Sequence, residues 1–393
     1  MGHILHLGVG NFFRAHQAWY TQACPGWEIT GVSFRSTTIR DRLAAQGYRY
    51  PLVIKDAQGT RVEEITCLRD MIVATQAPDD VLAQIAADAT QLVTLTVTEK
   101  AYHLGPDGQL DMDDPAVVAD LAGGPQTPIG ALARGLAARR APVTVLSCDN
   151  LPGNGAKLGA AVRRFAKAAG LEIGPPVSFP SCMVDRITPA TTDEIRAEAG
   201  DAMAVPTEAF TEWVIEDDFA AARPEWPGVQ WVRDVAPHEM RKLRMLNGAH
   251  SYLAYAGTLA GHTYVHEAVA DPALRAGAAA LMAEAASTLP PDANADGYAD
   301  ALLQRFDNPN LHHRLRQIAM DGSQKMPIRI VATRAARSDP SPALEAAIRA
   351  WVAFVRSEVA AGRALDDPMA DQLVDACAAT HPDAALRAMI MRE

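Results

Sequence analysis

Three side chains that can take up a proton or hold an oxygen atom lie in one short segment. On an α-helix with about 100° per residue, Lys242, His250 and Asn247 project into one sector of about 140°. A lysine can remove the proton of an alcohol, and amide and imidazole groups can hold the remaining oxygen. The spacing therefore predicts that three groups with reaction chemistry could share one ligand. The alternative is structural, with Lys242 extended to solvent and the other two hydrogen-bonded in the core.

The same segment predicts an α-helix with a defined start and end. Pro237 and Glu239 suit its first turn, and Gly257 would end it after the run from Tyr252 to Ala256. Lys242 and His250 would lie about 12 Å apart along the axis. The lysine stem must therefore lean along the helix if both side chains are to reach one ligand.

The composition is typical of a globular protein with a small-molecule partner. The 393 residues allow two or three domains, and 49% hydrophobic with 21% charged residues is ordinary. A net charge of -11 argues against nucleic acid, whose binding proteins carry a basic surface, and against an anionic membrane.

The cysteine usage indicates a reducing compartment. The five cysteines are widely spaced and form no Cys-x-x-Cys or Cys/His pattern. No basic leader precedes the first strand, and no apolar run approaches about 18 residues. We therefore expect a cytoplasmic protein. Because His312 and His313 are adjacent, they make a poor metal pair, and we expect no metal site.

The N-terminal residues predict a dinucleotide-binding turn. An apolar strand from His3 leads into a Gly-x-Gly turn at Gly8 and Gly10, and Asn11 and Phe12 open a helix. Glycines let the backbone approach a pyrophosphate, and the start of a helix offers free N–H groups. The third glycine of the usual fingerprint is absent, so a tight strand-to-helix turn is the alternative.

The second predicted strand, Trp27 to Phe34, lacks the acidic residue that usually binds an adenine ribose. The chain continues with Arg35, Ser36, Thr37 and Thr38 instead. An arginine followed by threonines could accept a 2'-phosphate. NAD is the expected cofactor, and these residues leave NADP as an alternative.

Polar residues follow two further predicted strands. Thr98 and Glu99 follow the strand Leu92 to Val97, and Asn150 follows the strand Val143 to Ser147. Open α/β sheets bind ligands beyond the carboxyl ends of their strands, which predicts that these residues line a site. A helix cap at Glu99 and an Asx turn at Asn150 are the structural alternatives.

The pattern of elements predicts two domains. Strands alternate with helices as far as about residue 233, including segments near Pro180 to Pro189 and Trp213 to Phe219, and the pattern is then almost entirely helical. We expect an α/β Rossmann-type domain over residues 1–233 and a mostly α-helical domain over residues 234–393. A polar loop from Gln317 to Pro327, with Lys325 in it, interrupts the helices and could reach a ligand.

Four segments together resemble the mannitol dehydrogenase family, the polyol-specific long-chain dehydrogenases. They span most of the chain in the family's order. The resemblance implies a metal-independent enzyme that uses NAD or NADP to interconvert a secondary alcohol and a ketone on a linear sugar alcohol or sugar acid. The sequence of residues Asp321 to Lys325 resembles the fructuronate reductase branch of the family more than the mannitol branch. The segments are His6 to Gln17, Ser147 to Pro152, Met183 to Pro189 and Lys242 to His250.

The resemblance also implies roles for single residues. Lys242 matches the general base, Asn247 and Asn150 match the donors to the oxyanion, and His250 matches the substrate-orienting histidine. Asp185 and Lys325 match positions that contact substrate, and Gly8 and Gly10 match the pyrophosphate turn.

Two other functions remain as alternatives. A dehydrogenase of a phosphorylated polyol such as mannitol 1-phosphate would need clustered cations, which Arg244, Arg314, Arg316 and Lys325 could supply. A nucleotide-binding sensor without catalysis is the second alternative. The intact set of Lys242, Asn247, His250 and Asn150 argues against the sensor.

Overall fold

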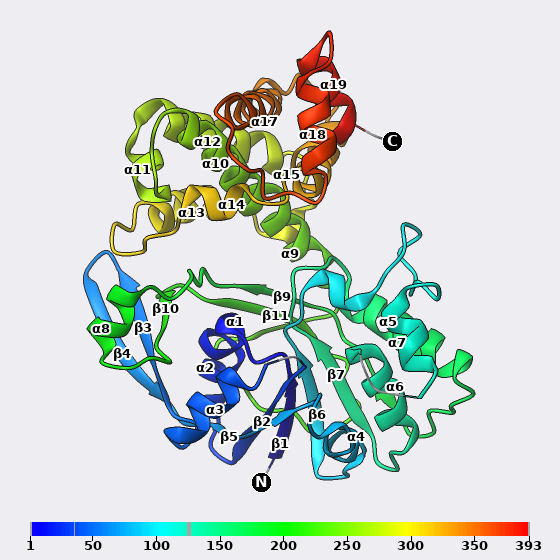
Figure 1. Cartoon of the computed structure of the whole chain (residues 1–393). Coiled ribbons are helices and arrows are strands. Elements are labelled where there is room, and N and C mark those ends of the chain that lie inside the picture. Colours follow the sequence, from blue (N-terminus) through cyan, green and yellow to red (C-terminus); the bar gives the residue numbers. More distant parts are fainter. Residues whose placement is uncertain (1, 35, 124–126, 392–393) are drawn as a thin grey trace. The chain divides into compact units, whose positions relative to one another are not determined.

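The computed structural model describes residues 2–34, 36–123 and 127–391, apart from the side chain of Glu99. Arg35, an expected cofactor residue, lies outside the described residues. The chain divides into two compact units, and Figure 1 labels most of their helices and strands. One unit comprises Met1–Lys55 and Thr60–Ala236, and the other comprises Asp56–Gly59 and Pro237–Glu393.

The N-terminal unit is built on a parallel six-stranded sheet in the order β5-β2-β1-β6-β7-β8. The order in which strands are added reverses at β1, because β2 and β5 extend the sheet on one side and β6 to β8 extend it on the other. A ligand is expected beyond the carboxyl ends of the strands at such a point. The strands are β1 (Gly2–Leu7), β2 (Trp27–Ser33), β5 (Leu68–Val73), β6 (Thr90–Leu95), β7 (Val143–Ser147) and β8 (Val177–Ser178).

Helices cover both faces of this sheet (Figure 1). Successive residues of a strand point to opposite faces, so Ile4 packs in the core beneath α1 to α3 and Leu5 in the core beneath α4, α6 and α7. Burial on both faces explains why the strands are almost continuously apolar. The helices are α1 (Asn11–Ala15), α2 (Gln17–Gln22), α3 (Thr38–Ala45), α4 (Pro78–Ala86), α5 (Pro115–Leu121), α6 (Pro128–Ala137), α7 (Asn154–Ala168) and α8 (Asp193–Ala199).

Two three-stranded sheets complete the unit, in the orders β10-β3-β4 and β12-β11-β9. The strands predicted near residues 180–189 and 213–219 form part of the second small sheet and do not extend the main one. β9 and β11 pair antiparallel, with Asp185 opposite Glu212. The strands are β3 (Tyr50–Asp56), β4 (Gly59–Ile65), β9 (Cys182–Asp185), β10 (Val205–Glu208), β11 (Glu212–Glu216) and β12 (Gln230–Val232).

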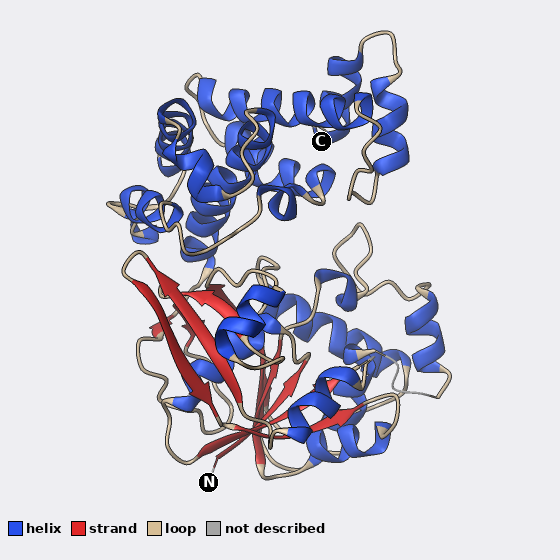
Figure 2. Cartoon of the chain, turned by 60° about the vertical axis from the view of Figure 1, so that its left-hand side comes forward, coloured by secondary structure: helices blue, strands red, loops and turns tan. Residues whose placement is uncertain are grey.

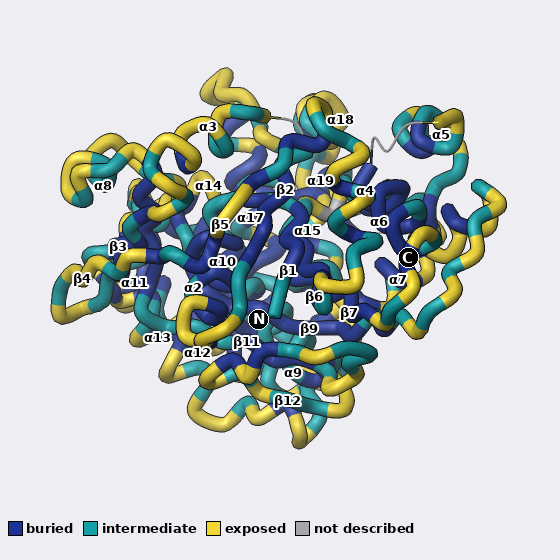
Figure 3. Tube along the Cα trace, turned by 90° about the horizontal axis from the view of Figure 1, so that it is seen from below, coloured by how far each residue is buried: buried dark blue, intermediate teal, exposed yellow. Residues whose placement is uncertain are grey.

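In the C-terminal unit, the described residues from Pro237 onward form helices and loops, which are blue and tan in Figure 2. Its core surrounds α10, which is mostly buried (Figure 3) and packs against α12, α14 and α17. The elements are α9 (Ala236–Arg241), η2 (Lys242–Asn247), α10 (Gly248–Leu259), α11 (Val265–Ala270), α12 (Pro272–Ala286), η3 (Pro291–Ala293), α13 (Tyr298–Phe306), α14 (Leu315–Ala319), α15 (Gly322–Met326), η4 (Pro327–Val331), α16 (Ala332–Ala335), α17 (Pro342–Ala360), α18 (Ala370–Cys377) and α19 (Pro382–Ile390).

These two architectures confirm the predicted fold class, a Rossmann-type α/β domain followed by a mostly α-helical one. The predicted end of the central helix at Gly257 is wrong, because α10 continues to Leu259. A Cβ atom on Gly257 would lie 2.9 Å from both Ala268 Cβ and Leu315 Cδ1. The glycine therefore serves close helix packing rather than termination. Among the described residues, no helix is long and apolar enough to cross a membrane.

Candidate active site

Gly8 and Gly10 serve different purposes in the turn after β1. Gly8 has a φ of +100°, and a Cβ there would lie 2.5 Å from the carbonyl oxygen of Thr96. Gly8 thus lets the turn close against the loop after β6. A Cβ on Gly10 would meet nothing within 4 Å. The space beside Gly10 fits a pyrophosphate that approaches the backbone.

His6 supports this turn from below and was not singled out from the sequence. Its Nδ1 lies 2.7 Å from Thr94 Oγ1, its Nε2 lies 2.9 Å from Thr96 Oγ1, and its ring stacks on Phe13 at 3.7 Å. Burial lowers the pKa of His6 to about 3, so the ring is neutral at physiological pH. The sequence signal was its position on β1, on the same face as Ile4 and two residues before Gly8.

The first helical segment is interrupted, although the sequence predicted one helix. α1 ends at Ala15, and α2 begins at Gln17. The side chain of Asn11 accepts a hydrogen bond from Arg14 Nη2 at 2.6 Å and donates to Thr191 Oγ1 at 3.2 Å. The Asn11 side chain therefore links α1 to the segment that contains Thr191.

The other expected residues of this unit lie in the loops after β6 and β7 and at the end of β9. Thr98 is exposed, and Glu99 opens the short helix η1 (Glu99–Tyr102). Asn150 is exposed after β7, whereas Asp185 is buried as the last residue of β9. Because the main sheet is parallel, β1, β6 and β7 end at the same edge, which brings the Gly8 turn, Thr98 and Asn150 to that edge.

Lys242 and Asn247 occupy the two ends of a π-helix, η2, between two α-helices. The sequence predicted an unbroken α-helix, so angles based on about 100° per residue do not hold across this segment. Lys242 and Asn247 are partly exposed, whereas Met245 and Leu246 are buried. π-Helical turns are rare and often occur at functional sites.

His250 lies one turn into α10 and is held among apolar and cationic groups. Its ring lies 4.6 Å from that of Phe306 and meets His313 edge-on at 5.4 Å. Nε2 of His250 is buried and has no hydrogen-bond partner among the described residues. Burial lowers the pKa of His250 well below its ordinary value, and His313, Arg305, Arg329 and Lys242 lower it further. The imidazole is therefore neutral.

A second π-helix, η4, packs against η2. Its Arg329 places Nη1 3.5 Å from the carbonyl oxygen of Asn247 and donates to Ser251 Oγ at 3.2 Å. Arg329 thus bridges η4 to the segment that carries Asn247 and His250. Sequence reasoning missed it, because an arginine after Pro327 carries no pattern of its own.

Lys325 lies in a short helix, α15, where the sequence predicted a loop. Its Nζ donates to the carbonyl oxygens of Met320 at 2.6 Å and Ile318 at 3.3 Å. Its preceding turn includes Asp321 at a φ of +54°. The ammonium is therefore anchored at the end of α14 within the C-terminal unit.

The structure groups the predicted residues within each unit. Lys242, Asn247 and His250 lie on one continuous helical run of the C-terminal unit. In the described part of the chain, no three histidine, cysteine, aspartate or glutamate side chains gather as metal ligands would.

Both units match known domains. Residues 2–228 match the mannitol dehydrogenase Rossmann domain, and residues 234–392 match the mannitol dehydrogenase C-terminal domain. These two matches identify an oxidoreductase that acts on CH–OH groups. The chain belongs to the mannitol dehydrogenase family, which confirms the predicted family.

Relatives with assigned names cover almost the whole chain. D-mannonate oxidoreductase of Escherichia coli is 38% identical over 93% of this chain and 83% of that protein. Mannitol 2-dehydrogenase of Phaeosphaeria nodorum is 37% identical over 94% of this chain and 72% of that protein. A solved structure, Pseudomonas fluorescens mannitol 2-dehydrogenase with NAD and D-mannitol, has a TM-score of 0.85 and 32% identity over 99% of this chain and 91% of that one.

Proposed function

We propose that this chain is a metal-independent dehydrogenase that interconverts a secondary alcohol and a ketone on a linear sugar acid or sugar alcohol, with Lys242 as the general base. The observation that supports this most is the helical run in which the ends of η2 carry Lys242 and Asn247 and α10 carries a neutral His250. The run provides a base, an amide donor and an uncharged imidazole. Together they can serve one hydroxyl group.

Lys242 handles the proton. In oxidation its neutral amine takes the hydroxyl proton as the carbinol carbon loses hydride, and in reduction its ammonium returns that proton to the new alkoxide. No metal is needed to activate the alcohol, because the amine removes the proton directly.

Asn247 and Asn150 hold the oxygen on which negative charge develops. Amide N–H groups donate hydrogen bonds without taking the proton that belongs to Lys242. Each such donor contributes about 3 kcal/mol when it is fixed in place and shielded from water. His250, being neutral, can accept or donate a hydrogen bond at the reacting oxygen or a neighbouring hydroxyl, and Asp185 and Lys325 are proposed to bind other groups of the substrate.

NAD is the proposed cofactor, as in the related Pseudomonas structure. Gly8 and Gly10 with the backbone of Asn11 and Phe12 would hold its pyrophosphate, and Thr98 and Glu99 would lie along its nicotinamide half. When bound, the nicotinamide accepts or supplies the hydride. If the chain uses NADP, Arg35 is the residue proposed to bind its 2'-phosphate.

A sugar acid of the D-mannonate/fructuronate type is the favoured substrate over a mannitol/fructose type. After burial and His313, which are the larger causes, the positive side chains of Arg305, Arg329 and Lys242 also lower the pKa of His250. A carboxylate on the substrate would be attracted to such surroundings.

Absorbance of the reduced cofactor tests the proposal directly. The panel pairs fructuronate, tagaturonate, fructose, mannitol, arabinitol and mannitol 1-phosphate with NAD(H) and NADP(H). Turnover of the keto acids is expected. Turnover of neutral polyols alone would contradict the sugar-acid choice, a preference for mannitol 1-phosphate would favour a phosphorylated substrate, and cofactor binding without turnover would favour a sensor.

A further inference from the structure

A buried cluster of three oxygen-bearing side chains lies under the loop that carries Asn150. Tyr102 ends η1 after β6, Ser147 ends β7, and Asp149 follows in the loop. The hydroxyl of Tyr102 donates to Asp149 Oδ2, which also accepts from Ser147 Oγ at 2.7 Å. The two hydroxyl oxygens lie 2.5 Å apart. All three residues are buried, and none takes part in the proton transfer proposed above.

Asp149 in turn holds the backbone around Asn150. Its Oδ1 accepts from the N–H of Leu151 at 2.9 Å. A carboxylate that accepts from the residue two positions on forms an Asx turn, which encloses the residue between them. That enclosed residue is Asn150. The turn that the sequence suggested is therefore formed by Asp149, while the side chain of Asn150 is exposed.

Asn154 anchors the same loop to β9. Its Nδ2 donates to the carbonyl oxygens of Asp149 at 3.2 Å and Cys182 at 2.8 Å, and its Oδ1 accepts from the Cys182 N–H at 3.0 Å. The loop is thus fixed at both ends of the short segment that contains Asn150. The hydrogen bond from Tyr102 to Asp149 also connects this loop to the neighbouring loop after β6.

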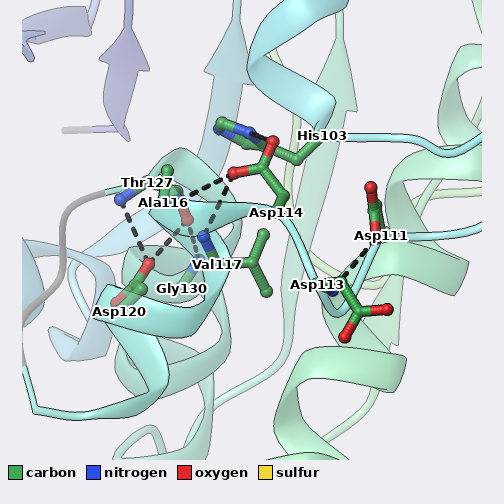
Figure 4. A network of polar contacts seen from close by, with 9 residues as sticks. All are labelled: His103, Asp111, Asp113, Asp114, Ala116, Val117, Asp120, Thr127 and Gly130. Carbon is green, nitrogen blue, oxygen red and sulfur yellow. Dashed lines mark hydrogen bonds and ion pairs between the residues drawn. The ribbon is translucent and has the colours of Figure 1, made fainter.

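Tyr102 remains a hydrogen-bond donor to Asp149 at physiological pH. Burial raises the pKa of its phenol well above the ordinary value, and the charge of Asp149 contributes, so the phenol keeps its proton. The next residue, His103, donates from Nδ1 to Asp114 Oδ2 at 3.0 Å, and Asp114 Oδ1 accepts from Ala116 N at 2.7 Å at the start of α5 (Figure 4). The Tyr102 hydroxyl is therefore attached to a fixed part of the unit.

We propose that Tyr102, acting through Asp149, is a positioning residue for the amide of Asn150. This inference rests on the proposed role of Asn150 as a donor to the substrate oxygen. Such a donor must be aimed where charge develops, and a displacement of about 1 Å can lower turnover about 100-fold. A buried carboxylate that loses one donor cannot replace it with water. Without the Tyr102 hydroxyl, Asp149 shifts toward Ser147 and the enclosed Asn150 moves with it.

A double-variant cycle tests the proposal. Tyr102→Phe keeps the ring in the core and removes only the donor. It is expected to lower kcat about 10- to 100-fold, with KM for the sugar substrate and Kd for NAD nearly unchanged. In an Asn150→Ala background, Tyr102→Phe should lower kcat no further, because the group that it positions is already absent. Ser147→Ala removes the other donor to Asp149 and should show the same non-additivity.

Tyr48→Phe is the matched control. It removes another phenol-to-carboxylate hydrogen bond in the same unit, from the partly buried Tyr48 to Asp70 Oδ1 at 3.0 Å. Its kcat should equal that of the unchanged enzyme. Melting temperatures of all variants show whether each one is folded.

Three results would overturn the inference. A folded Tyr102→Phe with normal kcat would show that the hydroxyl positions nothing, and additive losses in the double variant would show that it acts without Asn150. If Tyr102→Phe does not fold, the cycle with Ser147→Ala decides by the same criterion. If Asn150→Ala itself leaves kcat unchanged, the proposed role of Asn150 fails and the positioning role fails with it, whereas additivity alone leaves the proposed function intact.

Discussion

Thr96 closes the turn at Gly8 through two of its oxygen atoms. Its hydroxyl donates to the Gly8 carbonyl oxygen at 2.7 Å, and its own carbonyl oxygen lies 2.5 Å from where a Cβ on Gly8 would be. A residue with a side chain is therefore disfavoured at position 8 for two reasons: the φ of +100° is strained for such a residue, and its Cβ would clash with Thr96. Gly10 differs, since the space around its missing Cβ is open.

Substitutions at the two glycines should separate folding from cofactor binding. Gly8→Ala is expected to lower the melting temperature, because it forces a positive φ on alanine and a clash with backbone. Gly10→Val is expected to leave the melting temperature nearly unchanged but to raise the Kd for NAD at least about 10-fold, because its side chain would fill the space proposed for the pyrophosphate. Thermal unfolding and a fluorescence titration with NADH measure the two effects. A Gly10→Val protein that binds NADH normally would contradict the proposed cofactor turn.

His6 should make the stability of the chain depend on pH. Its pKa of about 3 in the folded state lies below the ordinary 6.5, so below pH 6.5 the unfolded chain binds a proton that the folded chain does not. The contribution of neutral His6 to the free energy of unfolding is therefore fully present above pH 6.5. It falls by about 1.4 kcal/mol per pH unit as the pH decreases toward 3. His6→Gln should be less stable at pH 7 but should lose less stability between pH 6.5 and 5.

Urea unfolding at several pH values measures this difference. His381→Gln, a change at an exposed histidine, is the control and should keep the pH dependence of the unchanged chain. Parallel pH profiles for His6→Gln and the unchanged chain would mean that His6 is not the group responsible.

The strands β1, β2, β6 and β7, the glycine turn and the lysine-bearing helix could be predicted from the sequence because each depends on residues close together in the chain. β1 is a short apolar run before Gly8, and hydrophobic periodicity marks α10. The small sheets could not be predicted in the same way. β3 pairs with β10, and the partner of Leu52 is Val205, so no local pattern indicates the pairing.

The local geometry of the site was also beyond the sequence. A π-helix differs from an α-helix by a shift of backbone hydrogen bonds, which side-chain types between Lys242 and Asn247 do not reveal. The contact of Arg329 with Ser251 and that of Tyr102 with Asp149 join residues from separate elements. The residue types with reaction chemistry were recognisable, but the groups that hold them were not.

Arg329 should influence the charge around His250 and the choice of substrate. Arg329→Gln removes one of the positive charges that lower the pKa of His250, so that pKa should rise, as NMR titration of the ring can show. The ratio of kcat/KM for a keto acid to that for a neutral ketone should fall about 10- to 100-fold, since a charged partner contributes about 1.5 to 3 kcal/mol to a hydrogen bond. Arg349→Gln, at an exposed position of α17, should change neither quantity. An unchanged substrate ratio would remove Arg329 from the argument for a sugar acid.

Asn247→Ala should affect turnover more than binding. Removing a donor aimed at the developing oxyanion is expected to lower kcat about 100- to 1000-fold. KM for the substrate should change little, because the hydrogen bond strengthens only as charge develops. Steady-state kinetics with saturating cofactor separate the two. A change confined to KM would show that Asn247 binds the ground state and is not an oxyanion donor.

Lys242→Ala is expected to lower kcat about 100- to 10,000-fold, the range for loss of a general base, while NADH still binds. Because alanine leaves space where the amine stood, a small primary amine such as methylamine should restore part of the turnover, and the rescue should grow with pH as more of that amine becomes neutral. Lys167→Ala, an exposed change in α7, controls for loss of a lysine charge and should retain full activity without any response to amines. Rescue by the amine would show that proton transfer is the function lost, whereas turnover that survives the substitution would mean that another group is the base. A collapse of turnover without rescue, in a protein that melts normally, would indicate that Lys242 acts by its charge and position rather than by taking the proton.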